Sequence, residues 1–336
     1  MNSINDIIST VRHLDLEKIR GLRPNYPPVA IEINHREMVL VRLKRRRGKT
    51  YLEAHQARAL PEATVGTSIV RPNLGSPDTV IKKVQDLFAA SGTRPGKVSL
   101  VLPDNLAKVS LMTLPERPGS RKQLTELIRF RLRRAVPFRL DDAVVSYQML
   151  QGDGKEITVL VALMLRSVIE QYERVFQAAG ARPGMVDLCT TNLFNLCRRS
   201  LVEASGGSRD VALLNCSETY FSLLIVRGER LVFYRCKSYA VGNGDGQAPN
   251  GVLAREVNSS LSYYQEKLGG EGIDTIFVRS VGKPMDEMTA LLEPLSFRRV
   301  TPVDPASVLT LAEGLRLDPD VAQRIAPAVG AAAGRG

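Results

Sequence analysis

The chain has 336 residues, 44% of them hydrophobic and 24% charged, which excludes a collagen-like or a wholly disordered protein. Its length suggests about two domains. Lys and Arg number 46 against 35 Asp and Glu, giving a net charge of +11. Residues 1–180 hold 29 basic and 18 acidic residues, whereas residues 181–336 hold 17 of each. All of the excess positive charge therefore lies in the first half, where it reflects either contacts to anions or an arginine-rich genome.

Cysteine and histidine spacing gives no sign of a metal site, because neither CxxC nor HExxH occurs. The cysteines are expected as buried free thiols, which suits a reducing cytosol. No stretch approaches 18 consecutive apolar residues, and the N-terminus lacks the apolar region of a signal peptide. We therefore expect a cytoplasmic protein without a transmembrane span, without a metal and without a cofactor.

The first third of the chain predicts a helix, three strands and a second helix. Apolar residues at helical spacing over 4–20 predict a short amphipathic helix, which a linker over 21–28 follows. Strands are expected at 29–33, 37–43 and 50–60, the last two joined as a hairpin around the basic turn Lys44–Lys49. This turn is either a solvated loop or a contact for anionic lipid or nucleic acid. A helix over 77–90 is expected to begin after Ser76 as its N-cap.

The middle of the chain alternates strands and helices. Strands are expected at 97–104, 107–115, 144–150, 156–165 and 185–188. Helices are expected over 121–136, where Pro137 would end the helix, over 168–179, and within 181–203.

The second half begins the same pattern again. Strands are expected within 211–226 and over 231–241, followed by a glycine-rich loop and a helix over 252–268. A strand over 274–280, a helix over 287–292, a strand over 298–303 and a small-residue helix over 323–334 complete the chain. The segments that begin at Val29 and Val211 both open a three-strand meander followed by a helix and a strand, which is a weak internal repeat. The repeat predicts a duplicated ribonuclease-H-like, actin-like α/β fold.

Several segments together resemble the PilM family of type IV pilus assembly proteins. A strand ending in Leu-Pro, a helix, a Val-Pro-Phe turn and a strand containing Tyr match the family at Leu114, Pro115, Val136, Pro137, Phe138 and Tyr147. REVNSSLSYYQEK and AQRIAPAVGAAA are similar to two of its helices, and the resemblance covers about 28–334. PilM resembles the cell-division protein FtsA, which implies an actin-like fold with an inserted small α+β subdomain.

The resemblance also implies a division of the chain into four parts. Residues 1–27 would be an N-terminal helix and linker, and 106–180 the inserted small subdomain. The first actin-like subdomain would comprise 28–105, 181–205 and the C-terminal helix 321–334, and the second half would comprise 206–320.

Actin-like ATPases bind phosphates with glycine-containing hairpins, and here these hairpins are altered. The glycines allow backbone N–H groups to approach phosphate, and an Asp holds the metal. The first hairpin keeps a carboxylate at Glu32 but has Asn34, expected to tolerate the left-handed conformation, in place of a glycine. The second has Asn215 for Asp and Ser217 for Gly, and retains Thr219; the adenosine segment keeps only Gly282. We therefore expect no ATP hydrolysis. Two possibilities remain: the hairpins bind a nucleotide without turnover, or they bind no ligand.

The strongest positive signal is a basic helix in the predicted insertion. Residues 117–139 carry eight basic residues and one acidic residue, and Arg129 and Arg133 share a helical face. This face is either solvated or docks an acidic or membrane-proximal partner. The resemblance implies a groove between the first and inserted subdomains that binds the cytoplasmic tail of the membrane protein PilN. The candidate groove residues are Leu114, Pro115, Arg129, Arg133, Pro137 and Phe138.

The function expected from these observations is that of a cytoplasmic scaffold. It would be held at the inner membrane by the tail of a single-span PilN-like protein and would link it to a motor ATPase. One alternative is a nucleotide-binding actin-like ATPase or kinase, which lacks its glycines and a clear Asp base here. A nucleic-acid binder is disfavoured because few aromatic residues lie near the basic runs. The last alternative, a GspL-like component of type II secretion, would require a transmembrane helix after Gly336.

Overall fold

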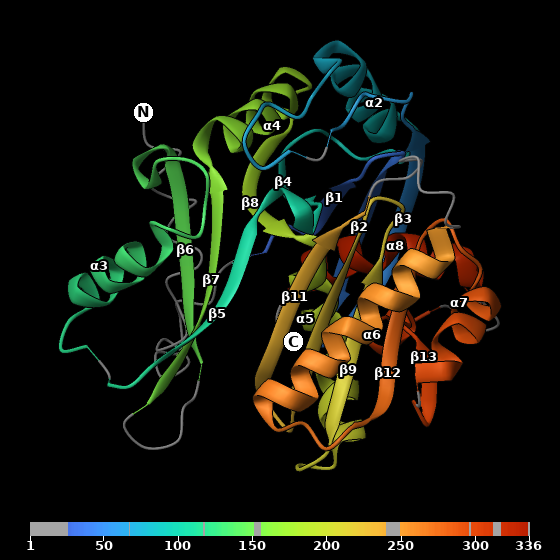
Figure 1. The fold of residues 1–336 in the computed structure, drawn as a ribbon. Coiled ribbons are helices and arrows are strands. Elements are labelled where there is room, and N and C mark those ends of the chain that lie inside the picture. The colour runs from blue at the N-terminus through green and yellow to red at the C-terminus, as the bar shows by residue number, and fades with distance from the viewer. Residues whose placement is uncertain are drawn as a thin grey trace.

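Two five-stranded sheets and one smaller sheet organise the chain (Figure 1). The computed structural model describes residues 26–66, 68–116, 118–150, 156–239, 249–295, 297–311 and 317–334. The helix expected over 4–20 and most of its linker, the turn at 151–155 and the glycine-rich loop at 240–248 lie outside these ranges. Among the described residues, no helix is both long enough and apolar enough to cross a bilayer.

The two large sheets repeat one topology. The first has the order β3-β2-β1-β4-β8 and the second has the order β11-β10-β9-β12-β13. In each, an antiparallel three-strand meander continues into parallel strands. The first sheet consists of β1 (Val29–Ile33), β2 (Glu37–Arg46), β3 (Lys49–Ala59), β4 (Lys97–Leu102) and β8 (Arg182–Leu188). The second consists of β9 (Asp210–Cys216), β10 (Tyr220–Arg227), β11 (Arg230–Ser238), β12 (Ile273–Ser280) and β13 (Arg299–Pro302). The predicted duplication is therefore confirmed.

Three pairs of helices cover the sheets and complete a layered α/β architecture (Figure 1). One pair packs on the outer face of the first sheet, one pair lies between the sheets, and one pair covers the outer face of the second sheet. In that order the helices are α2 (Pro77–Ala90) and α4 (Arg166–Ala178), α5 (Cys189–Ser205) and α8 (Pro319–Ala333), and α6 (Pro249–Leu268) and α7 (Met285–Leu292). Short 3-10 turns are η2 (Asp104–Leu106), η3 (Leu140–Asp142), η4 (Glu293–Leu295) and η5 (Pro305–Ser307).

The middle layer joins the two halves in one apolar core. Side chains from both sheets meet those of α5 and α8, so that neither half buries this face alone. The two helices approach closely at Gly330, where a Cβ would lie 2.1 Å from the backbone oxygen of Asn192. A glycine is therefore required in the small-residue helix that the sequence predicted at the C-terminus.

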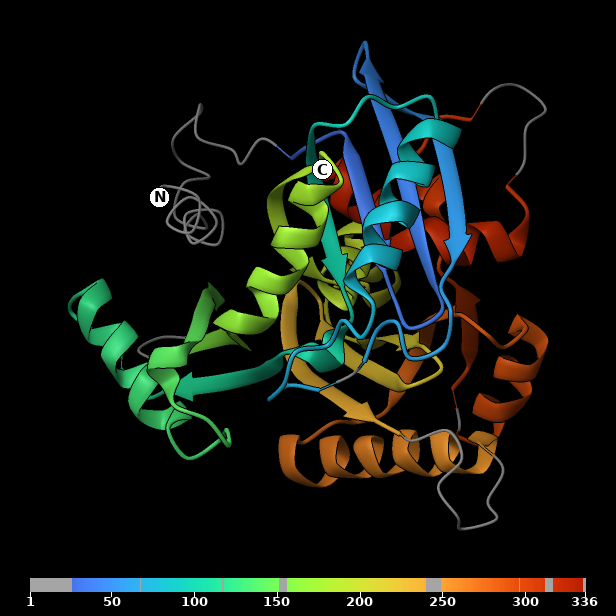
Figure 2. The same ribbon diagram turned by 90° about the horizontal axis from the view of Figure 1, so that it is seen from above.

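A small unit with its own core projects from the first half (Figure 2). It contains an antiparallel sheet of order β5-β7-β6, with one helix packed on one face. Its elements are β5 (Lys108–Leu114), α3 (Arg121–Leu132), β6 (Ala143–Leu150) and β7 (Ile157–Leu165). Helix α4, which follows β7, instead buries Tyr172 and Phe176 in the core of the first half. The range 106–180 suggested for the insertion is thus longer than this unit, whose own core ends at Leu163.

Two helix ends differ from the sequence prediction. Helix α3 begins after Ser120, whose hydroxyl accepts a hydrogen bond from the N–H of Gln123, but it ends at Leu132 and not at Val136. A proline disfavours helical geometry in the preceding residue, and here the helix stops several residues before Pro137. Ser76 precedes α2 without capping it, because its hydroxyl bonds the hydroxyl of Thr79 at 2.7 Å.

Candidate functional site

The first candidate site is the interface between the two β-hairpins that begin the two halves. Glu32 lies on β1, with only 2% of its surface exposed, and Asn34 follows directly after this strand. The Asn34 side chain accepts hydrogen bonds from the backbone N–H groups of Arg36 and Glu37, both at 2.9 Å. Asn34 is not among the residues with positive φ, so the left-handed conformation that it could tolerate is not used here. The amide side chain closes the turn by accepting two hydrogen bonds, which removes the need for that conformation.

The second hairpin is closed by hydrogen bonds of its own. Asn215 lies near the end of β9 with no exposed surface, and the N–H of Ser217 donates to the carbonyl of Tyr220 at 2.9 Å. The carbonyl of Thr219 accepts from the N–H of Tyr239 at 2.9 Å. In the first hairpin, the N–H of Asn34 likewise donates to Glu37. The backbone N–H groups of Asn34 and Ser217 are therefore already used within their own hairpins.

A buried arginine lies between the two hairpins. Arg279 on β12 is 1% exposed, and its guanidinium donates to Glu32 Oε1 at 2.9 Å and to Asn215 Oδ1 at 3.2 Å. It also donates to the carbonyl of Gln323 on α8 at 3.0 Å and contacts the Cys189 sulfur at 3.5 Å. One side chain thus bonds elements of both halves, at the position where the sequence predicted an adenosine segment.

The charges of this pair are strongly coupled. Burial raises the pKa of Glu32 above its ordinary value, although the Arg279 charge beside it acts to lower that pKa. Burial also disfavours the charged guanidinium, but the Glu32 carboxylate, together with Cys189 and Tyr220, outweighs this effect and raises the pKa of Arg279. Each charge therefore requires the other to be stable at this buried position.

A second buried carboxylate, Asp104, lies deeper in the same interface and is missing from the sequence-based candidates. Its two oxygens accept hydrogen bonds from the N–H and hydroxyl of Thr190, from the Asn215 amide at 3.1 Å and from the Ser222 hydroxyl at 2.8 Å. Burial raises the pKa of Asp104, and the donated hydrogen bonds oppose this shift. A Leu-Pro-Asp run at the end of a buried strand was the signal in the sequence for this carboxylate.

The mouth of the interface is crossed by an ion pair. Arg36 from the first hairpin pairs with Glu218 from the second. Gly282 has a φ of +87°, and a Cβ there would lie 2.8 Å from Glu218 Oε1, so this glycine gives the Glu218 side chain its space. Gly282 therefore makes room for the ion pair between Arg36 and Glu218 at the edge of the interface. Within the described ranges, no group of three His, Cys, Asp or Glu residues could hold a metal ion.

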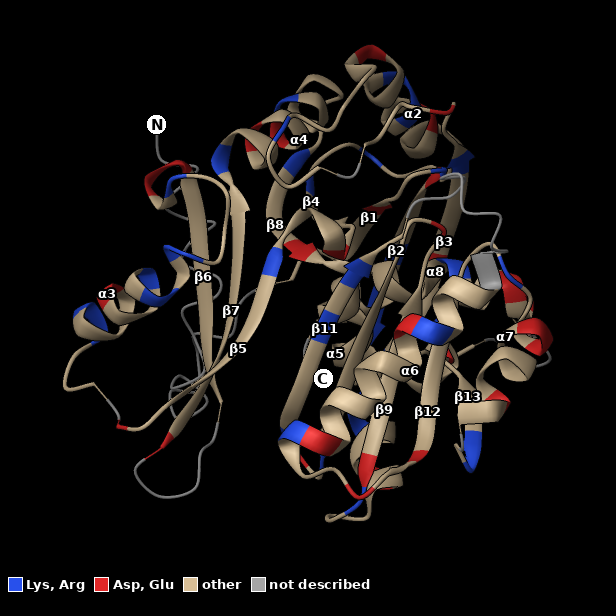
Figure 3. Ribbon diagram, in the orientation of Figure 1, with Lys and Arg blue, Asp and Glu red and all other residues tan. Residues whose placement is uncertain are grey.

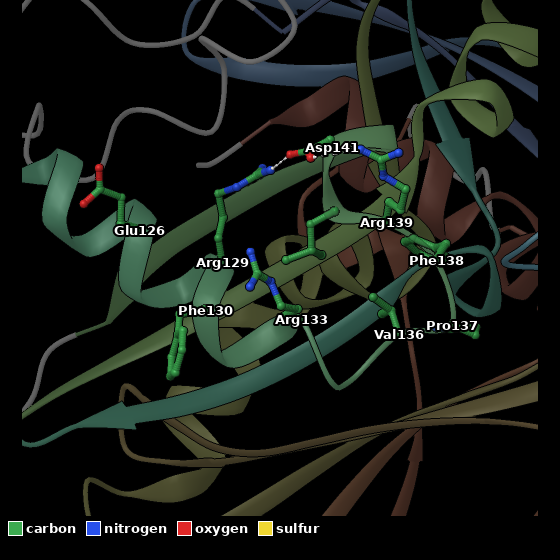
Figure 4. Close-up of a pocket in the computed structure, with 10 residues that line it drawn as sticks. Glu126, Arg129, Phe130, Arg133, Val136, Pro137, Phe138, Arg139 and Asp141 are labelled. Carbon is green, nitrogen blue, oxygen red and sulfur yellow. Dashed lines mark hydrogen bonds and ion pairs between the residues drawn. The ribbon is translucent and has the colours of Figure 1, made fainter.

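The second candidate site is an open pocket on the inserted unit, with a volume of about 960 Å³ (Figure 4). It lies between the end of α3 and the following turn, beside the junction with the first half. Phe138, at its inner edge, packs partly against the cores of both the inserted unit and the first half. Its lining is Glu126, Arg129, Phe130, Arg133, Val136, Pro137, Phe138, Arg139, Leu140 and Asp141.

The pocket combines apolar side chains with a cationic rim. Phe130 is 74% exposed, more than any other large apolar side chain in the part of the chain that the structure describes. Arg129 pairs with Asp141 at 2.5 Å, and Arg139 reaches the same carboxylate at 3.8 Å. Arg133 has no ion pair within the described ranges. Figure 3 shows further basic segments along α3. The pocket therefore suits an apolar peptide segment with an acidic residue beside it.

Residues 30–245 match the family of the type IV pilus assembly protein PilM. The chain belongs to the PilM family. A solved PilM–PilN type IV pilus biogenesis complex matches with a TM-score of 0.76 and 17% identity, covering 93% of this chain and 98% of that one. The ethanolamine utilization protein EutJ from Carboxydothermus hydrogenoformans matches at 0.45 and 9% identity, covering 99% of each chain. Comparison with curated proteins finds no match.

The PilM-family structure places the predicted site residues in two groups. Glu32, Asn34, Asn215, Ser217, Thr219 and Gly282 lie on the two hairpins or just after the end of β12. Four of the six predicted groove residues line the pocket: Arg129, Arg133, Pro137 and Phe138. Leu114 is instead fully buried in the core of the inserted unit, and Pro115 is exposed outside the pocket. The other six lining residues, Phe130 among them, were not predicted as groove residues.

Proposed function

We propose that this PilM-family protein is a cytoplasmic scaffold that docks on the cytoplasmic tail of a single-span, PilN-like inner-membrane protein. The observation that carries the proposal is the open pocket, where an exposed Phe130 and a cationic rim lie beside the junction between two subdomains. The tail would place apolar side chains against Phe130 and Phe138, and an acidic residue against Arg133. Docking would hold the protein at the membrane and link the envelope complex to a cytoplasmic motor ATPase.

Titration of a fluorescent peptide with the sequence of the PilN-like tail tests this proposal. Because Phe130 is exposed, Phe130→Ala should leave the fold intact and weaken binding at least tenfold, or by about 1.4 kcal/mol. Phe138→Ala and the double variant Arg129→Glu/Arg133→Glu should also weaken it. Tyr263→Ala, which removes a 44% exposed aromatic on α6, is the matched control. Equal affinity of wild type and of the Phe130, Phe138 and double arginine variants, with unchanged circular dichroism, would place the site elsewhere.

We further propose that the interface between the hairpins neither binds nor hydrolyses Mg-ATP. The buried Arg279–Glu32 pair supports this proposal, because the guanidinium already occupies Oε1 of the carboxylate that would hold a metal ion, and the N–H groups of Asn34 and Ser217 are already bonded. Wild-type protein should give no thermal shift and no calorimetric signal with ATP or ADP and magnesium. Phosphate release above background that disappears in Glu32→Ala would overturn it.

A further inference from the structure

Three loops meet at the end of the first sheet where β1, β4 and β8 begin. Lys97 and Arg182 are neighbours in the register of β4 and β8, and the Arg42 guanidinium donates to the carbonyl of Gly92 at 3.2 Å. The three segments, 43–52, 90–97 and 178–183, contain no acidic residue. We call this surface the basic end; its cations are Lys44, Arg45, Arg46, Arg47, Lys49, Arg94, Lys97 and Arg182.

The β2–β3 ribbon carries most of this charge away from the body of the protein (Figure 2). The register of β1 with β2 ends at Arg42, the N–H of Leu43 still donates to the carbonyl of Pro28, and beyond Leu43 the strand β2 pairs with β3. The residues from Arg45 to Lys49 are exposed. The base of the ribbon is held by the core through Leu43 and Leu52 and by a hydrogen bond from the N–H of Thr310 to the carbonyl of Thr50, whereas its tip, residues 45–49, presents only cations and Gly48.

The tip of the ribbon places an arginine where the backbone disfavours it. Arg47 and Gly48 form a two-residue loop with φ values of +50° and +75°. Such loops favour Asn-Gly, because both residues must adopt the left-handed conformation. The outermost point of the ribbon thus carries the positive charge of Arg47, although Asn would suit the turn better.

Few of these cations are neutralised by the protein. Glu53 accepts ion pairs from Lys44 at 2.8 Å and from Arg42 at 3.2 Å, and Arg45 donates to the carbonyl of Ala333 at the end of α8. The remaining six form no ion pair in the part of the chain that the structure describes. A surface of one charge sign therefore faces solvent over three separate loops.

We propose that the basic end contacts an anionic phospholipid leaflet. The cations are spread over a projecting tip and two loops, an arrangement that fits a broad charged surface and not a small ligand. Tyr51 is the one aromatic residue in the three segments and is half-buried, so bases of a single-stranded nucleic acid have no stacking platform there. The choice of a membrane rests on the proposed function, in which a PilN-like protein holds the chain beside the inner membrane.

The expected strength follows from the number of cations near the surface. Each Lys or Arg close to an anionic leaflet strengthens binding by about fivefold. Loss of three such cations should therefore weaken vesicle binding on the order of a hundredfold. The attraction should also fall with salt, because the Debye length shrinks from about 10 Å at 0.1 M to about 3 Å at 1 M.

Vesicle flotation of the full chain tests the proposal without any partner protein. Wild type should float with vesicles that contain phosphatidylglycerol at low salt, and should float neither with pure phosphatidylcholine vesicles nor at high salt. The tip variant Arg46→Glu/Arg47→Glu/Lys49→Glu should lose binding. Its control reverses three cations on α2, α5 and α6 and changes the net charge equally: Lys82→Glu, Arg198→Glu and Lys267→Glu.

Binding by the control but not by the tip variant would support the proposal. Equal loss in both variants would overturn it in favour of net charge, and no flotation of wild type would also overturn it. Salt-sensitive binding to duplex DNA with no vesicle binding would assign the surface to nucleic acid and overturn it as well. The tip variant should bind the tail peptide like wild type, so failure of the membrane contact and failure of the proposed docking are separately visible.

Discussion

Replacement of Arg279 by methionine removes the central cation of the interface between the two halves. Methionine keeps much of the side-chain volume and removes the guanidinium, so the change isolates the charge and its hydrogen bonds. Glu32 would keep only the Cys189 thiol, at 3.7 Å, as a donor among the described residues. The acceptors Asn215 Oδ1 and the carbonyl of Gln323 would lose the donor that Arg279 supplies.

The expected cost is large because the charge that remains is buried. Breaking a buried ion pair by removing one partner costs about 3–5 kcal/mol of unfolding free energy. The total stability of a folded domain is about 5–15 kcal/mol, so Arg279→Met should remove a substantial part of it. The double variant Glu32→Gln/Arg279→Met leaves no buried charge at this pair and should be more stable than Arg279→Met alone.

The unfolding free energy lost in Arg279→Met should depend on pH in a defined direction. The ordinary pKa of Glu32 is 4.5, burial raises it in the folded protein, and loss of Arg279 removes the charge that acts to lower it. An acid whose folded pKa is raised contributes stability below its ordinary pKa and loses it as the pH rises through the folded pKa. The Arg279→Met deficit should therefore be smaller at about pH 5 than at about pH 8.

Urea unfolding followed by circular dichroism measures these free energies for wild type, both single variants and the double variant. The slopes in urea must be equal, so that the change in midpoint reports stability. A deficit below about 1 kcal/mol that is the same at both pH values would refute the reasoning, because a surface-like pair behaves in that way.

Three further predictions concern other buried features. Asp104→Ala removes the acceptor for donors from three elements and should cost about 3 kcal/mol in urea unfolding; an unchanged midpoint would contradict this. Gly330→Ala should cost about 1–3 kcal/mol because its Cβ would overlap Asn192 O, whereas the helical control Gly251→Ala, which has open space for its Cβ, should not destabilise; equal stability of the two variants would count against the close contact. Burial raises the pKa of Cys216 to about 11 and of Cys197 to about 12, so both thiols should resist iodoacetamide at about pH 8 until the protein unfolds; rapid native labelling would show that they are accessible.

The repeated strand order could be predicted from the sequence because it follows from local patterns. Alternating and continuous apolar runs mark strands, and their succession after Val29 and after Val211 is the same. The prediction of altered phosphate hairpins has the same basis, since Asn34, Asn215 and Ser217 are read directly where glycine or Asp is expected. Both inferences depend on residue type and spacing alone.

The contents of the interface were decided by tertiary structure. Arg279 is 247 positions from Glu32 in the sequence, and only the parallel placement of β9 beside β12 brings its side chain toward the first half. Asp104 likewise meets Asn215 across 111 positions. Periodicity predicts which face of a strand is buried, but it does not say which polar partner lies there, because that depends on how two distant elements are packed.

The same distinction between sequence and tertiary structure applies to the two charged surfaces. The basic helix was evident from residues 117–139, yet the exposure of Phe130 and the burial of Leu114 depend on how α3 lies on its sheet. The turn at 44–49 was evident as a basic run, but its neighbours Arg94 and Arg182 join it only because parallel strands bring their starting ends together at one edge. Composition thus determined how much charge this chain carries, and the fold decided where that charge is concentrated.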